Sequence, residues 1–442
     1  MVSFHRSICS PRRGVPRIAA LAGSIAIAGS AMSSALAQEA PPTITLGQIA
    51  PFTGSAAEFG RFYEDAVALA VEQLNTAAEE VFGGPIIARH ITEDTNTLPA
   101  PGIEAARKLV EVDGVAAIVG GWSSGVTTAI AESVSIPSGV LQVANGATSP
   151  LISVLPSDEQ ADLIFRTTSP DTLQGIVAAQ LANGEIIDDY KFKTAATIYI
   201  NNPYGQGLSN SFTESFESRG GKVVAQVPHP EEVQPTYRSQ LSTALEQDPD
   251  LLMVVSYPGH TAVILQETRD FFDMDEWQFV DGNKSTAVLE AVGAETLAGK
   301  YGTSPGQNPA SPGYENFSKA YDHQRIPPFT ASAYDAAIAI GLATAAAIAS
   351  GEEQLTGEVL RDHLRPVSNP PGKEITGGSQ EAITQAMKMI KEGQDINYAG
   401  ASGAVDFDEQ GDVVTPIEVW KFTADGGVET VEYQSAEEIP EK

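Results

Sequence analysis

The sequence is nearly without cysteine. Cys9 is the single one among 442 residues, and it lies ahead of the apolar run Ile18–Ala31. Four arginines precede that run and Ala35-Leu36-Ala37 fits a small-x-small cleavage site, so we predict that residues 1–37 are an export signal. The mature chain then contains no cysteine, which excludes a disulfide, a cysteine metal ligand and a thiol nucleophile.

Basic side chains are also scarce. The chain has 26 Lys and Arg against 57 Asp and Glu, and its formal net charge is -31 at pH 7. Residues 1–37 hold four arginines and no acid, so the formal charge of the mature chain is -35. Such an acidic chain repels nucleic acid and anionic membranes, and we expect neither as a partner.

Patterns that bind metals or cofactors are missing as well. The six histidines are scattered, without the H-x-x-x-H spacing of zinc ligands. The acidic segment 406–412 places Gln410 at the third ligand position of a calcium loop, and Gly205-Gln206-Gly207 lacks the third glycine of a dinucleotide fingerprint. We therefore expect no metal site and no cofactor.

Long apolar runs are rare in the mature chain. Residues 331–350 approach the length of a membrane span and carry one charge, Asp335. Alanine dominates this run, and alanine contributes little to membrane insertion. We predict a buried helix rather than a span.

Strand and helix patterns alternate along the mature chain, which is typical of an α/β fold with parallel sheets. One unit begins at Ile44 and a second starts afresh at Thr194, so a chain of this length fits two lobes. Segments 153–170 and 299–312, which bear Pro and Ser, are predicted passages between units. The predicted helices cover 60–74, 103–110, 205–219, 237–245, 261–271, 334–348 and 356–364, and the predicted closing strands cover 405–415, 417–422 and 428–433.

Two predicted strands end in small, hydroxyl-bearing turns. The first leads into Ser123-Ser124, where a helix should begin, and the next leads into Gly146-Ala147-Thr148. Hydroxyls and free N–H groups at a helix start attract an anion, and parallel strands end at one edge of a sheet. We predict that these residues cradle the carboxylate of a small polar ligand. Ser124 and Thr148 could instead only cap a helix and a turn.

The same turn offers an enzymatic alternative. Residues 121–125 read G-x-S-x-G, the pattern of a nucleophile elbow with Ser123 as the nucleophile. The pattern is weak in a chain with 40 glycines, and a triad would need an acid and a histidine downstream. A secreted serine esterase remains a remote alternative.

Short motifs spread over nearly the whole mature chain resemble a known family. In order they are LGQIAPFTGSAAEFGR, GWSSG, NGATSP, FRTTSPDTLQG, INNPYGQGL, FVDGNKS, SAYDAA and GAVDFDEQGD. Their order and spacing resemble the periplasmic solute-binding proteins of the leucine/isoleucine/valine-binding type, which serve ABC importers. The resemblance implies two Rossmann-like lobes with a three-crossover hinge, a Venus-flytrap clamp that closes on a small molecule. It implies an N-terminal lobe of residues 38–167 plus 306–404 and a C-terminal lobe of residues 168–305 plus 405–442.

The resemblance also implies how the ligand is held. Ser124, Gly146, Ala147 and Thr148 resemble the residues that bind the carboxylate of an amino acid through uncharged donors. Asp281 resembles the acid that receives the ligand ammonium. A plain turn after a strand is the alternative for this aspartate.

Aromatic residues complete the implied site and differ in part from the family. Tyr204 and Tyr257 resemble residues that cover the ligand, although they could merely plug the cleft. Trp122 is larger than the expected aliphatic residue, Phe59 replaces a common tyrosine, and Ser123 replaces a usual cysteine. These changes leave the class intact but put a leucine/isoleucine/valine preference in doubt.

The predicted function is therefore a non-enzymatic periplasmic receptor. It would hand an α-amino acid, branched-chain or related, to an inner-membrane ABC permease, and it would act as a monomer. A ligand of the amide, urea or small organic acid class stays open, in which case the contact of Asp281 fails. Service to a separate signalling protein as a ligand sensor is a third possibility.

Overall fold

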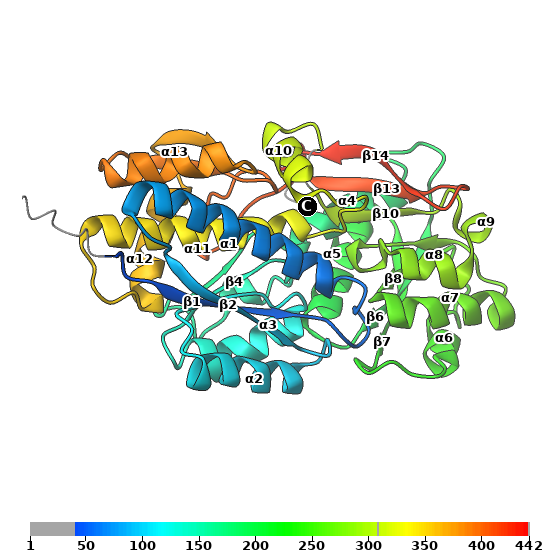
Figure 1. Ribbon diagram of the computed structural model, residues 1–442. Coiled ribbons are helices and arrows are strands. Elements are labelled where there is room, and N and C mark those ends of the chain that lie inside the picture. Colours follow the sequence, from blue (N-terminus) through cyan, green and yellow to red (C-terminus); the bar gives the residue numbers. More distant parts are fainter. Residues whose placement is uncertain (1–39, 307–308, 441–442) are drawn as a thin grey trace, which may run out of the picture. The chain divides into compact units, whose positions relative to one another are not determined.

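Two parallel sheets form the frame of the chain in the computed structural model, which describes residues 40–306 and 309–440 (Figure 1). The predicted export signal, residues 1–37, lies outside the described residues. The first sheet has the order β2-β1-β3-β4-β5, with β1 (Ile44–Ala50), β2 (Ile87–Asp94), β3 (Ala117–Val119), β4 (Leu141–Ala144) and β5 (Ile164–Arg166). The second has the order β7-β6-β8-β9, with β6 (Thr194–Ile200), β7 (Lys222–His229), β8 (Leu251–Val255) and β9 (Trp277–Gln278). The predicted α/β class is confirmed.

Helices connect these strands and pack on both sheets. They are α1 (Gly60–Phe82), α2 (Pro99–Arg107), α3 (Ser124–Ile130), α4 (Asp171–Ala182), α5 (Pro203–Ser218), α6 (Arg238–Ala244), α7 (Pro258–Phe272), α8 (Thr286–Val292), α9 (Ala294–Leu297), α10 (Pro312–Tyr321), α11 (Thr330–Ser350), α12 (Gly357–Ser368) and α13 (Gln380–Lys391). Short π-helical segments, Lys108–Val112 and Ala131–Ser135, extend α2 and α3, and 3-10 turns cover Ile152–Val154 and Asp281–Asn283.

The elements follow from their burial patterns. Strands β3, β4 and β8 are buried at every residue, as continuous apolar strands of a parallel sheet should be. In α1 the apolar stripe continues past Leu74 through Ala77, Ala78 and Val81, so the helix runs further than predicted. It ends where Gly83 adopts a φ of +86°, a conformation that glycine reaches without strain.

The predicted closing strand over 405–415 is wrong, and the two predicted passages contain strands that were not expected. Segment 153–170 contains β5, and segment 299–312 contains β10 (Tyr301–Pro305), which pairs with β13 (Ile417–Phe422). Strand β13 pairs in turn with β14 (Val428–Gln434) in an antiparallel sheet. Segment 405–415 forms no strand, because its acidic turn folds back on itself through Asp408. Another small sheet pairs β11 (Lys373–Thr376) with β12 (Ile396–Ala399).

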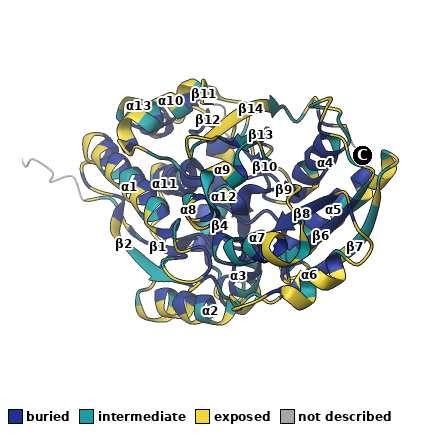
Figure 2. Ribbon diagram, turned by 90° about the vertical axis from the view of Figure 1, so that its right-hand side faces the viewer, coloured by how far each residue is buried: buried dark blue, intermediate teal, exposed yellow. Residues whose placement is uncertain are grey.

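Helix α11 lies at the centre of the helices that pack on the first sheet. It packs against α1, α12 and α13, so segments far apart in sequence lie side by side (Figure 1). Among the described residues it is the one helix apolar and long enough to span a membrane, yet 89% of its most apolar window is buried, and Figure 2 shows it dark blue among the surrounding helices. The carboxylate of its single charged residue, Asp335, accepts hydrogen bonds from Tyr398 and from the amides of Ala401 and Ser402. A buried core helix was the prediction, and the burial supports it.

We refer below to two lobes. The first lobe is the first sheet with α1–α3 and α10–α13, and the second lobe is the second sheet with α4–α9, β10, β13 and β14. The predicted residue boundaries of the two lobes remain a prediction.

Candidate functional site

Two loops of the first lobe meet at the carboxyl edge of its sheet. The loop after β3 carries Ser123 and leads into α3 at Ser124, while the loop after β4 carries Gly146, Ala147 and Thr148. The Ser124 hydroxyl accepts a hydrogen bond from the backbone amide of Ser149, at 3.1 Å, and this bond joins the two loops. Since the Ser124 oxygen serves here as acceptor, its proton is available to an anion. The structure therefore brings the predicted carboxylate cradle together.

A buried ion pair shapes the second of these loops. Arg166, at the end of β5, is fully buried and donates to both carboxylate oxygens of Asp412, at 2.6 and 2.8 Å. The same guanidinium donates to the carbonyls of Ala147 and Ser149, at 3.1 and 2.8 Å. Arg166 thus fixes the path of the loop around Thr148, a role that the sequence analysis missed. Its partner Asp412 lies 246 positions away in the sequence, so no local pattern marked this arginine.

The second lobe contributes an acid in a dry environment. The Asp281 carboxylate accepts hydrogen bonds from the amide of Gln174 and from the phenol of Tyr204, both at 2.9 Å. Burial raises the pKa of Asp281 to about 6, although these two bonds oppose the shift. Gly282 is needed beside it, because a Cβ there would come within 2.5 Å of the Ser256 carbonyl oxygen. An acid held this way in a dry site suits a ligand cation.

A second buried acid, Asp171, was missed by the sequence analysis. It opens α4, and its amide donates to the carbonyl of Thr148 at 2.7 Å. Burial raises its pKa well above the ordinary value, and the negative charge of Asp281 adds to the shift, while Thr148 and Arg166 oppose it. Neither its carboxylate oxygens nor the Thr148 hydroxyl makes a hydrogen bond of ordinary geometry within the described residues. The motif FRTTSPDTLQG contained this aspartate, but nothing in its spacing marked it as a site residue.

Four aromatic rings cross between the lobes. Phe59 and Trp122 of the first lobe lie with ring centroids 5.4 Å apart, and Trp122 contacts Tyr257 of the second lobe at 4.7 Å. Tyr257 stacks on Tyr204 at 5.5 Å, and Tyr204 is the phenol that donates to Asp281. All four side chains are at most 4% exposed. The predicted aromatic residues are therefore contiguous with the predicted acid.

The lobes are closed on each other around this site. The Tyr257 phenol donates to the Ser123 hydroxyl at 3.0 Å, and Ser149 donates to the carbonyl of Pro203 at 2.9 Å. The Gly259 amide, two residues beyond Tyr257, donates to the carbonyl of Ser55 at 3.0 Å. With the lobes in contact, Ser124, Thr148, Asp171 and Asp281 are each at most 3% exposed.

Glu58 of the first lobe forms a larger contact with the second lobe. Its carboxylate accepts hydrogen bonds from the amide and hydroxyl of Thr286, at 2.9 and 2.6 Å, from the Ser285 hydroxyl, and from Arg325. These partners hold the pKa of Glu58 below its ordinary value despite the burial that opposes them. We call this cluster the Glu58 latch.

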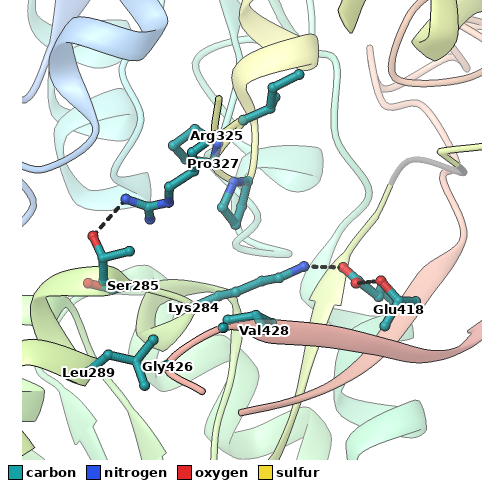
Figure 3. A pocket seen from close by; sticks show the side chains of 13 residues that line it. Lys284, Ser285, Leu289, Arg325, Pro327, Glu418, Gly426 and Val428 are labelled. Carbon is teal, nitrogen blue, oxygen red and sulfur yellow. Dashed lines mark hydrogen bonds and ion pairs between the residues drawn. The ribbon is translucent and has the colours of Figure 1, made fainter. Parts of the chain in front are cut away.

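A pocket of about 350 Å³ lies beside the latch (Figure 3). Arg325 and Pro327 form one wall, and Lys284 and Val428 lie opposite, with the ammonium of Lys284 directed to Glu418. Its charged side chains are paired, so the pocket presents no free charge to a ligand.

The esterase alternative finds no support in this geometry. The hydrogen-bond partner of the Ser123 hydroxyl is the Tyr257 phenol, and no described hydrogen bond joins Ser123 to a histidine. His229 bonds the Pro230 carbonyl and Ser256, and His260 bonds Tyr237. The catalytic serine of a triad needs a histidine base within hydrogen-bond reach. Within residues 40–306 and 309–440, no group of three His, Cys, Asp or Glu side chains is arranged to hold a metal ion.

Comparison with known proteins identifies the family. The profile of the periplasmic binding protein family matches residues 43–404. The chain belongs to the periplasmic binding protein family. It is 28% identical over 403 residues to the chemotactic signal transduction system substrate-binding protein BasB of Halobacterium salinarum, covering 88% of this chain and 89% of BasB. It is 32% identical over 212 residues to the leucine-, isoleucine-, valine-, threonine- and alanine-binding protein of Pseudomonas aeruginosa, covering 48% of this chain and 52% of that protein.

Solved structures of periplasmic binding proteins share the fold. The leucine-binding protein LivK of Thermotoga maritima matches with a TM-score of 0.72 and 22% identity, covering 89% of this chain and 99% of LivK. A solute-binding protein of an ABC transporter from R. palustris in complex with benzoate matches with a TM-score of 0.65 and 17% identity, covering 88% and 96%. The predicted resemblance to the leucine/isoleucine/valine-binding type is confirmed. Such periplasmic binding proteins include binders of branched-chain amino acids and of aromatic acids, so membership leaves the ligand open.

Proposed function

We propose that this chain is the exported receptor of an ABC importer and that it binds an α-amino acid between its lobes without chemical conversion. The observation that carries the proposal is the pairing of an uncharged hydroxyl cradle with two buried acids across one closed interface. The cradle, with Ser124 and Thr148, suits a carboxylate, and Asp281 and Asp171 suit an ammonium.

The charge balance of the site favours a zwitterion over a simple acid. Arg166, whose charge acts on Asp171, is already bonded to Asp412, and Lys284, three residues beyond Asp281, is paired with Glu418. A ligand carboxylate alone would therefore enter beside two acids with no cation to offset them. The ammonium of an amino acid offsets that charge and offers three donors for oxygens that lack partners. This argument disfavours benzoate-like acids, and it disfavours urea and amides because they carry no positive charge.

A thermal-shift screen followed by calorimetry tests the proposal. The mature protein would be screened against the common L-amino acids, acetamide, urea, benzoate and 4-hydroxybenzoate. A ligand at a hundred times its Kd stabilises the protein by about 2.7 kcal/mol, so a true hit is readily seen. We expect an amino acid to be the best ligand, with no turnover of it over hours.

Two variants then test the residues. Ser124→Ala and Asp281→Ala should each weaken binding of that amino acid about ten-fold or more, since hydrogen bonds to charged groups contribute about 1.5–3 kcal/mol. Ser157→Ala and Asp270→Asn, which alter exposed residues, serve as controls. Unchanged affinity in both site variants would contradict the proposed site, and a best ligand without an ammonium would contradict the proposed ligand class.

A sensory role is a second candidate, because the relative BasB is named as part of a chemotactic signal transduction system. The two roles separate in cells. Deletion of the gene should abolish uptake of the labelled amino acid if the chain serves an importer. If it serves a sensor, deletion should abolish attraction to that amino acid while uptake persists.

A further inference from the structure

The Trp122 side chain fills space that a branched ligand side chain would need. Its ring fills the space between Phe59, at 5.4 Å, and Tyr257, at 4.7 Å between centroids. These distances are those of rings in direct contact, so nothing the size of an isobutyl group fits between them. The compartment next to the hydroxyl cradle is therefore occupied by the protein's own indole.

The backbone opposite is adapted to this indole. A Cβ placed on Gly146 would lie 2.3 Å from Cδ1 and 2.8 Å from Nε1 of Trp122, and 3.2 Å from Cγ of Phe329. Any residue other than glycine would push the ring away. The pyrrole edge of the indole thus lies directly over the loop of the carboxylate cradle, and its N–H is close to Gly146.

The indole N–H is a buried donor with no partner. Trp122 is 4% exposed, and its Nε1 makes no hydrogen bond within the described residues. Trp277 and Trp420 also have unpaired N–H groups, but they lie among the rings of Phe279 and Phe422. Trp122 differs because its indole lies against Gly146, in the loop that carries Thr148, and the Thr148 hydroxyl also makes no hydrogen bond of ordinary geometry within the described residues. A buried N–H without a partner, beside the carboxylate cradle, can donate a hydrogen bond to a bound anion and is then no longer unsatisfied.

We infer that Trp122 sets the ligand preference of this receptor: its N–H donates to the ligand carboxylate, and its ring restricts the ligand to α-amino acids with small side chains. The inference rests on the proposed binding of an amino acid. It narrows that proposal to ligands such as alanine, serine and threonine, and it places leucine, isoleucine and phenylalanine among poor ligands.

Two substitutions separate the two roles of Trp122. Trp122→Phe keeps most of the bulk and removes the donor, so it should weaken all amino-acid ligands about ten-fold while leaving their order unchanged. Trp122→Leu also opens the compartment, so it should shift the preference toward leucine over alanine by about ten-fold or more, the range that a few methylenes give in a fitted pocket. Trp420→Phe is the matched control, because it removes a buried unpaired N–H in the second lobe, away from the cradle.

The experiment measures Kd by calorimetry for glycine, L-alanine, L-serine, L-threonine, L-valine, L-leucine and L-phenylalanine with the wild-type chain and the three variants. Support requires that the wild type binds alanine, serine or threonine at least about ten-fold tighter than leucine, and that Trp122→Leu narrows or reverses that gap. Equal or tighter binding of leucine by the wild type overturns the inference, and so does an unchanged order in Trp122→Leu. If the wild type binds none of these amino acids, the proposed function itself fails, which is a different result from a wrong order among ligands that bind.

Discussion

Asp281 should make ligand affinity depend on pH in the mildly acidic range. Its carboxylate has a pKa of about 6 in the structure, raised by burial. A ligand ammonium binds the ionised form, so affinity should be full well above pH 6 and should fall as the carboxylate takes up a proton. At pH 5 about one-eleventh of a group with this pKa is ionised, so the association constant should drop about ten-fold, or about 1.4 kcal/mol.

The pH dependence of stability without ligand has the opposite sign to that of ligand affinity. A carboxylate whose folded pKa exceeds its unfolded value binds a proton more tightly in the folded protein, so its contribution to the free energy of unfolding falls as pH rises from about 4 to about 6. A ligand ammonium stabilises the ionised carboxylate of Asp281, so binding near pH 6 should release a proton from this group. Burial also raises the pKa of Asp171 well above its ordinary value, and the charge of Asp281 adds to that shift, so the two acids influence each other's ionisation. Tyr204 and Tyr63, the nearby phenols, are held neutral because burial raises the pKa of each well above its ordinary value.

Calorimetry at pH 8, 7, 6 and 5, in buffers of different ionisation enthalpy, measures both the affinity and the protons released. Asp281→Asn should lose overall affinity and flatten the profile, whereas Asp270→Asn, a half-exposed aspartate of α7, should leave it unchanged. An affinity constant within about two-fold from pH 5 to 8 would refute the assignment of the ammonium to Asp281, as would an undiminished pH profile in Asp281→Asn.

Three further predictions follow from contacts outside the ligand site. Glu58→Gln removes the charge that holds the latch to Thr286 and Arg325. Stopped-flow kinetics should therefore show ligand release about ten-fold faster, with the association rate changed less than about three-fold. An unchanged release rate would contradict the role of the latch. Asp412→Asn leaves the Arg166 guanidinium buried without its anion, and urea unfolding should show a loss of about 3–5 kcal/mol; a loss under about 1 kcal/mol would contradict a structural ion pair. Gly146→Ala places a methyl group 2.3 Å from the indole above it, so affinity should fall and tryptophan fluorescence should shift; wild-type values in both measurements would show that the contact is not tight.

The sequence predicted the frame of this protein well because the frame depends on local patterns. Alternating strands and helices predict parallel sheets. The apolar residues of α1 recur every three to four positions, which predicts a helix with one buried face. The errors fall where long-range pairing decides. Strand β10 forms because β13, more than a hundred residues later, offers it a partner, and β5 forms at the edge of the first sheet beside β4. Proline and serine in those segments gave local signals for loops, and pairing with distant strands overrode them.

The site was predicted in part for a similar reason. Hydroxyls at strand ends and an acid before a glycine are visible in the sequence, and the structure gathers Ser124, Thr148 and Asp281 around one interface. Asp171 and Arg166 escaped notice because their positions depend on contacts that no short motif encodes. A buried arginine bonded to an aspartate some 246 positions away has no local signature.

The unsatisfied groups of the closed site bear on how the lobes move. In the closed arrangement the Thr148 hydroxyl, the Asp171 carboxylate and the Gln174 carbonyl oxygen are buried and make no hydrogen bond of ordinary geometry within the described residues. Burying each such group costs about 1–3 kcal/mol relative to its hydrated state. This cost raises the free energy of the closed form when no ligand is bound. Rim contacts such as the Glu58 latch and the bond from Tyr257 to Ser123 favour closure and offset part of that cost. In the proposed complex the ligand ammonium would satisfy the acids and leave the rim contacts intact, so its binding energy would act directly on the balance between open and closed lobes.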